Sequence, residues 1–180
     1  TYLASVTLYS LGAISYAFIL LRGLELGISE GFAPLVYACI QVFHVLSGLP
    51  AGELSDKIGR VRAIQLGYVL LLGSFLVMAL APGPLILLIG ASLFGAHQGM
   101  VETSQRAIIP CLVPEEYRGT AYGLYNMLIG VVALPTNLVA GLLFSMSSAF
   151  AFYYGAVFAA LASIVIAFVG NVSKNPIERR

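Results

Sequence analysis

Charged side chains are scarce in this sequence: Asp, Glu, Lys and Arg make up only 9% of its 180 residues, while hydrophobic residues reach 59%. Soluble domains usually carry about 25% charged and about 45–50% apolar residues. The composition therefore predicts a protein whose solvent is a lipid bilayer. The net charge of only +1 also argues against a nucleic-acid partner, because such a partner selects a strongly basic surface.

Residues that bind metals or form disulfides are equally rare. Two His and two Cys, none of them clustered at ligand spacing, predict no metal site and no cofactor. Cys39 lies within an apolar run and Cys111 beside a basic connection, so we expect no disulfide between them. The sequence enters apolar residues directly at Thr1, without the basic start of a signal peptide. We expect it to be a piece of a longer protein.

Long apolar runs fill most of the chain. A membrane-spanning helix needs about 20 mainly apolar residues, and six segments qualify: 3–22, 32–53, 63–81, 84–106, 119–144 and 147–170. Short connections join them, which predicts an all-α, six-helix transmembrane domain over residues 1–170 and a tail at 171–180. The third and sixth segments have few polar residues and are expected to face lipid.

The basic residues are divided unequally between the two ends of this predicted bundle. Eight of the nine lie in the connections 54–62 and 106–118 and in the tail, whereas Arg22 alone lies at the other end. Basic connections remain in the cytoplasm, so these two connections and the C-terminus are predicted to be cytoplasmic. Arg22 is expected to extend its charge to the lipid headgroups.

The connection GELSDKIGRVR at 52–62 has five charged residues among eleven. Gly52 and Gly59 permit close helix approach and a tight turn. Asp56 can cap the amino terminus of a neighbouring helix, where the helix dipole favours a negative charge. This spacing of Gly, Asp and Gly is more than a basic membrane anchor requires.

GELSDKIGRVR resembles the loop signature of the major facilitator superfamily, G-x-x-x-D-[RK]-x-G-R-[RK]-[RK]. Val61 departs from it, and the matching residues are Gly52, Asp56, Lys57, Gly59, Arg60 and Arg62. YAFILLRGLELG, LPAGELSD and VPEEYRGTAYGLYN are similar to the ends of the seventh and eighth helices and the entry of the eleventh helix in family members. The resemblance covers nearly the whole chain and implies the carboxy-terminal six-helix half, family helices seven to twelve.

What the resemblance implies is half of a secondary active transporter in a prokaryotic inner (cytoplasmic) membrane, moving a small solute by alternating access. The segment 52–62 would latch the cytoplasmic side against the amino-terminal six-helix half, which lies outside this sequence. Within the chain, Arg60 is expected to pair with Glu102. The expected partners are the solute, membrane lipid, the other half and protons as coupling ion.

Polar residues inside the predicted spans are functional candidates, because they are costly in lipid. They lie on the first, second, fourth and fifth predicted spans. In family members, the corresponding four helices of each half line the central cavity, so the resemblance implies that these residues face it. Gln105 continues the face of Gln98 and Glu102, and the candidate charge relay is Glu102, Arg106 and Arg118. The candidate cavity residues are Tyr9, Tyr16, Tyr37, Gln41, His44, His97, Gln98, Tyr125, Asn126 and Asn137.

Structural alternatives stay open for these residues. His44 and His97 can be hydrogen-bonded packing residues, and Glu102 can simply pair with Arg106 one helical turn later. Two other function classes also stay open: a membrane-embedded acyl or prenyl transferase that uses a His, and a non-transporting receptor or scaffold on the same fold. The sequence fixes neither the substrate nor the direction of transport.

Overall fold

A computed structural model describes residues 2–172. The α-helices in this range are α1 (Tyr2–Gly12), α2 (Tyr16–Glu25), α3 (Ala33–Ile58), α4 (Arg60–Ala79), α5 (Pro84–Leu112), α6 (Arg118–Met146) and α7 (Ser148–Val172), with short 3-10 turns at Glu30–Phe32 and Glu115–Tyr117. Six stretches are long and apolar enough to cross a membrane, α1 and α2 together forming the first. The predicted fold class, an all-α bundle of six membrane-spanning segments, is confirmed.

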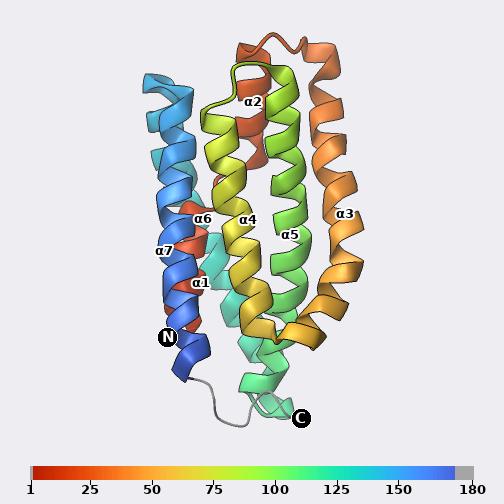
Figure 1. Ribbon diagram of the computed structural model, residues 1–180. Helices are drawn as coiled ribbons and strands as arrows, with labels where there is room; N and C mark the ends of the chain where they lie inside the picture. The colour runs from red at the N-terminus through yellow and green to blue at the C-terminus, as the bar shows by residue number, and fades with distance from the viewer. Residues whose placement is uncertain (1, 173–180) are drawn as a thin grey trace.

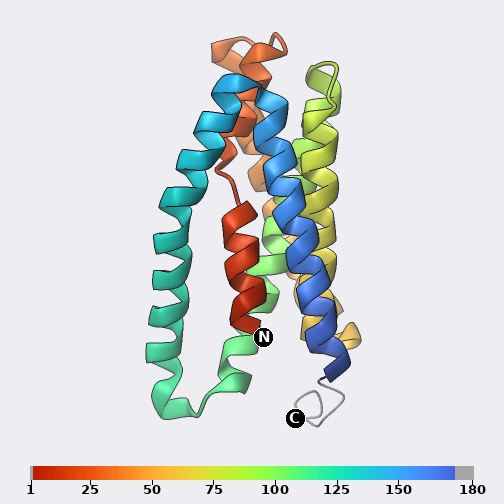
Figure 2. The same cartoon turned by 90° about the vertical axis from the view of Figure 1, so that its left-hand side faces the viewer.

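The spans run alongside one another as one bundle (Figure 1). α5 packs against both α3 and α4, and α4 also packs against α7. α1 lies between α6 and α7 (Figure 2) and contacts both. The α3–α4 junction and the α5–α6 connection lie at one end of the bundle, opposite the α4–α5 and α6–α7 connections.

Glycine brings α3 and α5 into close contact. A Cβ atom at Gly95 would collide with the carbonyl of Ile40, and one at Gly99 would collide with the carbonyl of His44 and the Ser47 hydroxyl. Lipid supplies little hydrophobic drive between helices, so this close backbone approach is what holds the pair. It also fixes the position of His44 against α5.

Burial is uneven among the spans. In the most apolar stretch of each helix, 44% is buried for α4, α5 and α7, but only 11% for α3 and α6. The outer faces of α4 and α7 expose apolar residues such as Val69, Leu76 and Ile164, as expected of helices that face lipid. Their inner faces form the core, where Phe75 contacts Phe152, so these two helices are not merely peripheral.

The expected connection at 52–62 is almost entirely helical. α3 continues through Pro50 to Ile58, and Gly59 alone separates it from α4. Gly59 has φ 91° and ψ 143°, a backbone conformation that side chains with a Cβ rarely adopt. The charged residues mark the edge of the apolar zone rather than the end of the helix. Asp56 and Lys57 therefore lie on the last turn of α3.

The first expected span, 3–22, is interrupted. α1 ends at Gly12 and α2 begins at Tyr16, so a short non-helical segment lies within a membrane-spanning stretch. Such a segment leaves backbone groups that lipid cannot satisfy. Neighbouring helices must therefore supply the partners.

Candidate functional site

The polar residues of the spans form two groups that differ in how far they are enclosed. One group, the closed network, lies in the core of the bundle and consists of Tyr9, Tyr68, His97, Gln105 and Tyr125. The other group, the open set, lies on the more exposed helix faces and consists of Tyr16, Tyr37, Gln41, His44, Gln98, Glu102 and Asn126.

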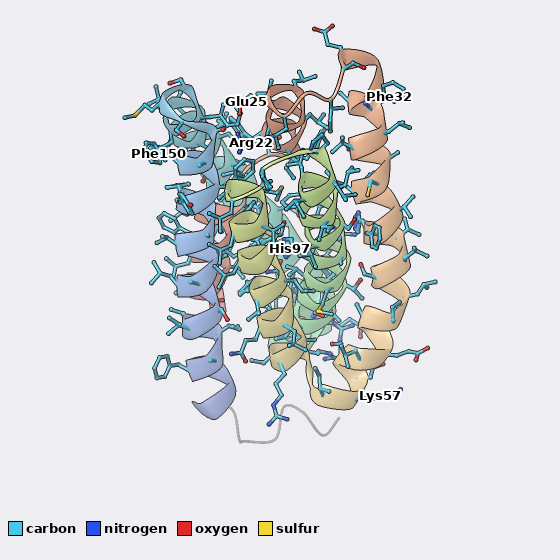
Figure 3. The ribbon with its side chains drawn as sticks, turned by 45° about the horizontal axis from the view of Figure 1, so that its top comes forward. Arg22, Glu25, Phe32, Lys57, His97 and Phe150 are labelled. Atoms are coloured by element: carbon cyan, nitrogen blue, oxygen red, sulfur yellow. The ribbon has the colours of Figure 1, made fainter. Side chains whose placement is uncertain are left out.

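His97 is the centre of one part of the closed network (Figure 3). Its side chain is 1% exposed. The ring Nδ1 lies 3.0 Å from the carbonyl oxygen of Gly67, and Nε2 lies 3.2 Å from the Tyr9 hydroxyl. Because a carbonyl can only accept, Nδ1 donates, and in the neutral ring Nε2 then accepts from Tyr9. This geometry is that of a packing histidine with both nitrogens satisfied.

The second part of the closed network joins α4, α5 and α6. The Tyr9 and Tyr68 rings stack with centroids 4.9 Å apart, and Gln105 Nε2 donates to the Tyr68 hydroxyl at 3.0 Å. The Tyr125 hydroxyl donates to Gln105 Oε1. Gln105 is 1% exposed and Tyr68 is fully buried, so both ends of one amide are engaged inside the bundle.

Sequence reasoning missed Tyr68 as a polar group. The third predicted span reads as apolar because tyrosine counts as a hydrophobic residue in a composition. The available signal was Gln105, a buried amide on a neighbouring span that needs both a donor and an acceptor.

Two tyrosines of the open set, Tyr16 and Tyr37, form an exposed aromatic pair. The rings of Tyr16, the first residue of α2, and Tyr37 of α3 have centroids 4.9 Å apart. Tyr16 is 43% exposed and Tyr37 37%. Gln41, one turn beyond Tyr37, is also exposed, as is Asn126 on α6. Aromatic rings and amide groups are thus presented on the exterior of the chain at membrane depth.

Ionisable residues of the open set meet between α3 and α5. His44 Nε2 lies 3.8 Å from Glu102 Oε2, and Arg106 lies 3.5 Å from the same oxygen. The side chains of His44 and Glu102 are 29% and 46% exposed. The carboxylate therefore sits between two groups that can carry positive charge. Arg118, the third member of the expected relay, is the first residue of α6.

Asn137, another cavity candidate, belongs to neither the closed network nor the open set. Its Oδ1 accepts from the backbone N–H of Ser15 at 2.9 Å, and its Nδ2 donates to the carbonyl of Ala133 at 2.8 Å. The amide is thus engaged within the chain, at the interruption of the first span.

The residues of the expected loop signature gather at one end of the bundle. Lys57 and Glu53 lie 4.0 Å apart on the exposed last turns of α3, and Asp56 beside them is exposed. At the same end, the Tyr122 hydroxyl donates to the carbonyl of Arg106 at 2.7 Å and ties the start of α6 to α5.

Arg22 lies near the opposite end (Figure 3). Its guanidinium donates to Glu25 at 3.1 Å, to the Ser148 hydroxyl at 2.9 Å and to the carbonyl of Ala81 at 3.3 Å. Its side chain is only 17% exposed. The structure therefore differs from the expectation of a charge extended to lipid headgroups: Arg22 joins the ends of α2, α4 and α7.

These features define a polytopic membrane protein with polar groups on two sparsely buried spans. The chain belongs to the Major Facilitator Superfamily, because the model of that family matches residues 2–179. The family resemblance inferred from the loop signature is confirmed.

Several curated proteins are similar to the chain. An uncharacterised transporter of the major facilitator type from Methanocaldococcus jannaschii is 30% identical in an alignment of 170 residues that covers 90% of this chain and 42% of that protein. A putative metabolite transport protein from Bacillus subtilis is 29% identical over 73% of this chain and 28% of its own length. The galactose-proton symporter of Escherichia coli is 24% identical over 66% of this chain and 29% of its own length. The chain thus spans less than half the length of these relatives.

Proposed function

We propose that this chain is the carboxy-terminal six-helix half, family helices seven to twelve, of a secondary active transporter. In this proposal it moves a small solute by alternating access, rocking against a second six-helix half about a site near the middle of the membrane. Family membership and relatives named as transporters support transport as the general function.

The observation that carries the proposal is the sparse burial of α3 and α6, 11% against 44% for α4, α5 and α7, together with the polar residues that they expose. Gln41 and Asn126 cannot face lipid without a large cost. We therefore propose that α3 and α6 face the second half and a water-filled cavity. Gly123 and Gly130 of α6 fit this role, since an added Cβ at either would meet nothing within 4 Å.

The proposed solute contacts are Tyr16, Tyr37, Gln41 and Asn126. Aromatic faces and amide groups together suit a small polar solute, because amides fix its orientation while rings cover its less polar side. One relative is named a galactose-proton symporter and another, from Staphylococcus epidermidis, a glucose transporter. Sugars are therefore the first solutes to test.

Proton coupling is proposed to involve His44 and Glu102. An ionisable residue within a span is a candidate proton carrier, and here a carboxylate and an imidazole lie 3.8 Å apart with Arg106 beside them. The name of the galactose-proton symporter supports protons as the coupling ion.

The segment 52–62 is proposed to be the conformational latch on the cytoplasmic side, with the connection 106–118 and the C-terminus on the same side of a prokaryotic inner membrane. Asp56 is exposed on the last turn of α3, where it can cap a helix of the second half. Asp56→Asn in the full-length protein should shift the balance between inward and outward accessibility. An unchanged balance contradicts the latch.

Solute flux tests the proposed function. The full-length protein is reconstituted in proteoliposomes, and uptake of radiolabelled galactose and glucose is measured with and without an inward proton gradient. Gradient-driven accumulation of either sugar is the expected result. Covalent turnover of an added lipid without flux would instead indicate the transferase, and binding without flux or turnover would indicate a receptor or scaffold.

A further inference from the structure

The interruption between α1 and α2 is held together by the chain itself. Helix α2 begins at Tyr16, and Ser15 precedes it with φ −63° and ψ 144°, its hydroxyl accepting from the N–H of Ala17. The N–H of Ile14 donates to the carbonyl of Gly12 at 2.9 Å. Two backbone groups next to the break, the carbonyl of Ser10 and the N–H of Ser15, take partners from elsewhere.

Both partners come from consecutive residues of α6. The hydroxyl of Thr136 donates to the carbonyl of Ser10 at 3.2 Å, and Oδ1 of Asn137 accepts from the N–H of Ser15 at 2.9 Å. One bond holds the last turn of α1 at Ser10, and the other holds the end of the break at Ser15. The donation from Asn137 Nδ2 to the carbonyl of Ala133 orients the amide so that its oxygen points to Ser15.

We infer that Asn137 is a positioning residue that fixes the amino end of α2, and through it the ring of Tyr16. Ser15 is the neighbour of Tyr16 in the chain, so a bond to the Ser15 N–H restrains the backbone from which that ring extends. Any shift of α6 is then transmitted to α2. The consequence for solute binding rests on the proposed role of Tyr16; the restraint on α2 does not.

The backbone of Ser15 allows a matched set of variants. Proline favours a φ close to the −63° observed at Ser15. Ser15→Pro therefore keeps this φ but removes both the N–H that donates to Asn137 and the Ser15 hydroxyl. Ser15→Ala removes only the hydroxyl and retains the N–H. Comparing Asn137→Ala in these two backgrounds isolates the bond between Asn137 and the Ser15 N–H.

The experiment uses the full-length protein with Cys39 and Cys111 replaced by Ala and Ala17→Cys, an exposed position, as reporter. Loss of one hydrogen bond shifts an equilibrium by roughly three- to tenfold. Asn137→Ala should therefore change the thiol-labelling rate about threefold or more in the wild-type and Ser15→Ala backgrounds. In the Ser15→Pro background it should change the rate less than about twofold. Equal changes in all backgrounds would overturn the inference.

Hydrogen exchange provides a second measurement that does not need the proline variant. The amide of Ser15 should exchange faster in Asn137→Ala than in the parent, while amides of α7 should exchange at unchanged rates. Unchanged exchange at Ser15 also overturns the inference. Labelling and exchange report on α2 whether or not the protein transports sugar. A rise in KM at constant kcat is expected only if the proposed function also holds.

Discussion

The closed network and the open set contain the same kinds of side chain within the spans, but they differ in how far their polar groups are buried and hydrogen-bonded. In the closed network, the His97 ring and the Gln105 amide have partners at both of their polar ends. In the open set, Tyr16 and Tyr37 each leave more than a third of their surface exposed. The polarity of a residue within a span therefore shows only that exposing its side chain to lipid would cost free energy. The enclosure of its polar atoms separates residues that hold the bundle together from those that we propose are available to a solute.

The largest expected effect on stability is at Gln105, and Gln41 provides the matched comparison. Gln105→Leu leaves two hydroxyls, those of Tyr68 and Tyr125, without their amide partner, and each buried unpaired polar group costs about 1–3 kcal/mol. We expect a melting temperature in detergent several degrees lower. Gln41→Leu, the same change at an exposed position, should leave stability within about 0.5 kcal/mol while reducing sugar flux. Equal destabilisation by both variants would remove the distinction between the two groups.

An intermediate effect is expected at Arg22, which resembles the closed network in its enclosure. Arg22→Met keeps much of the apolar length of the side chain but removes the donors to Glu25, Ser148 and the carbonyl of Ala81. One hydrogen bond to a charged group contributes about 1.5–3 kcal/mol. Because the Glu25 side chain is 42% exposed, we expect the three bonds together to contribute about as much as one such bond. Thermal unfolding of the full-length protein measures the loss. A melting temperature equal to that of the parent would show that Arg22 contributes no more than a surface charge.

The smallest effect on stability is expected at Glu102. Exposed ion pairs contribute at most about 1 kcal/mol, so Glu102→Gln should hardly alter the melting temperature. It should, however, abolish gradient-driven accumulation of sugar while sugar exchange across the vesicle continues. Arg106→Gln, which retains Glu102, is the control. Accumulation by Glu102→Gln at the parental level would exclude this carboxylate from coupling.

The sequence was sufficient to predict the six spans and the family, because a bilayer requires long apolar runs and the spacing of GELSDKIGRVR is distinctive. It could not predict the break at residues 13–15. Gly and Ser also occur inside unbroken spans, and the residue that stabilises the break, Asn137, is 122 positions away from Ser15. Apolar patterning continues across such a break.

The sequence predicts which polar residues are candidates for the site, but not which of them lie together or which are buried. Cost in lipid marks a polar residue as a cavity candidate, and this criterion applies to His97 and His44 equally. The three-dimensional contacts separate them: His97 bonds to Gly67 and Tyr9 in the core, whereas His44 lies beside Glu102 on a partly exposed face. Neither set of partners is encoded in local spacing, because both come from other helices.

Solute protection of single cysteines tests the central claim, that α3 and α6 face a water-filled path shared with a second six-helix half. Gln41→Cys, Asn126→Cys and, on the outer face of α4, Val69→Cys are compared in the full-length protein lacking Cys39 and Cys111. The first two should react with a membrane-impermeant, water-soluble maleimide and be protected by a transported sugar, while the third should react slowly and without protection. Equal labelling at all three positions, or no labelling at Gln41→Cys and Asn126→Cys, would contradict the account.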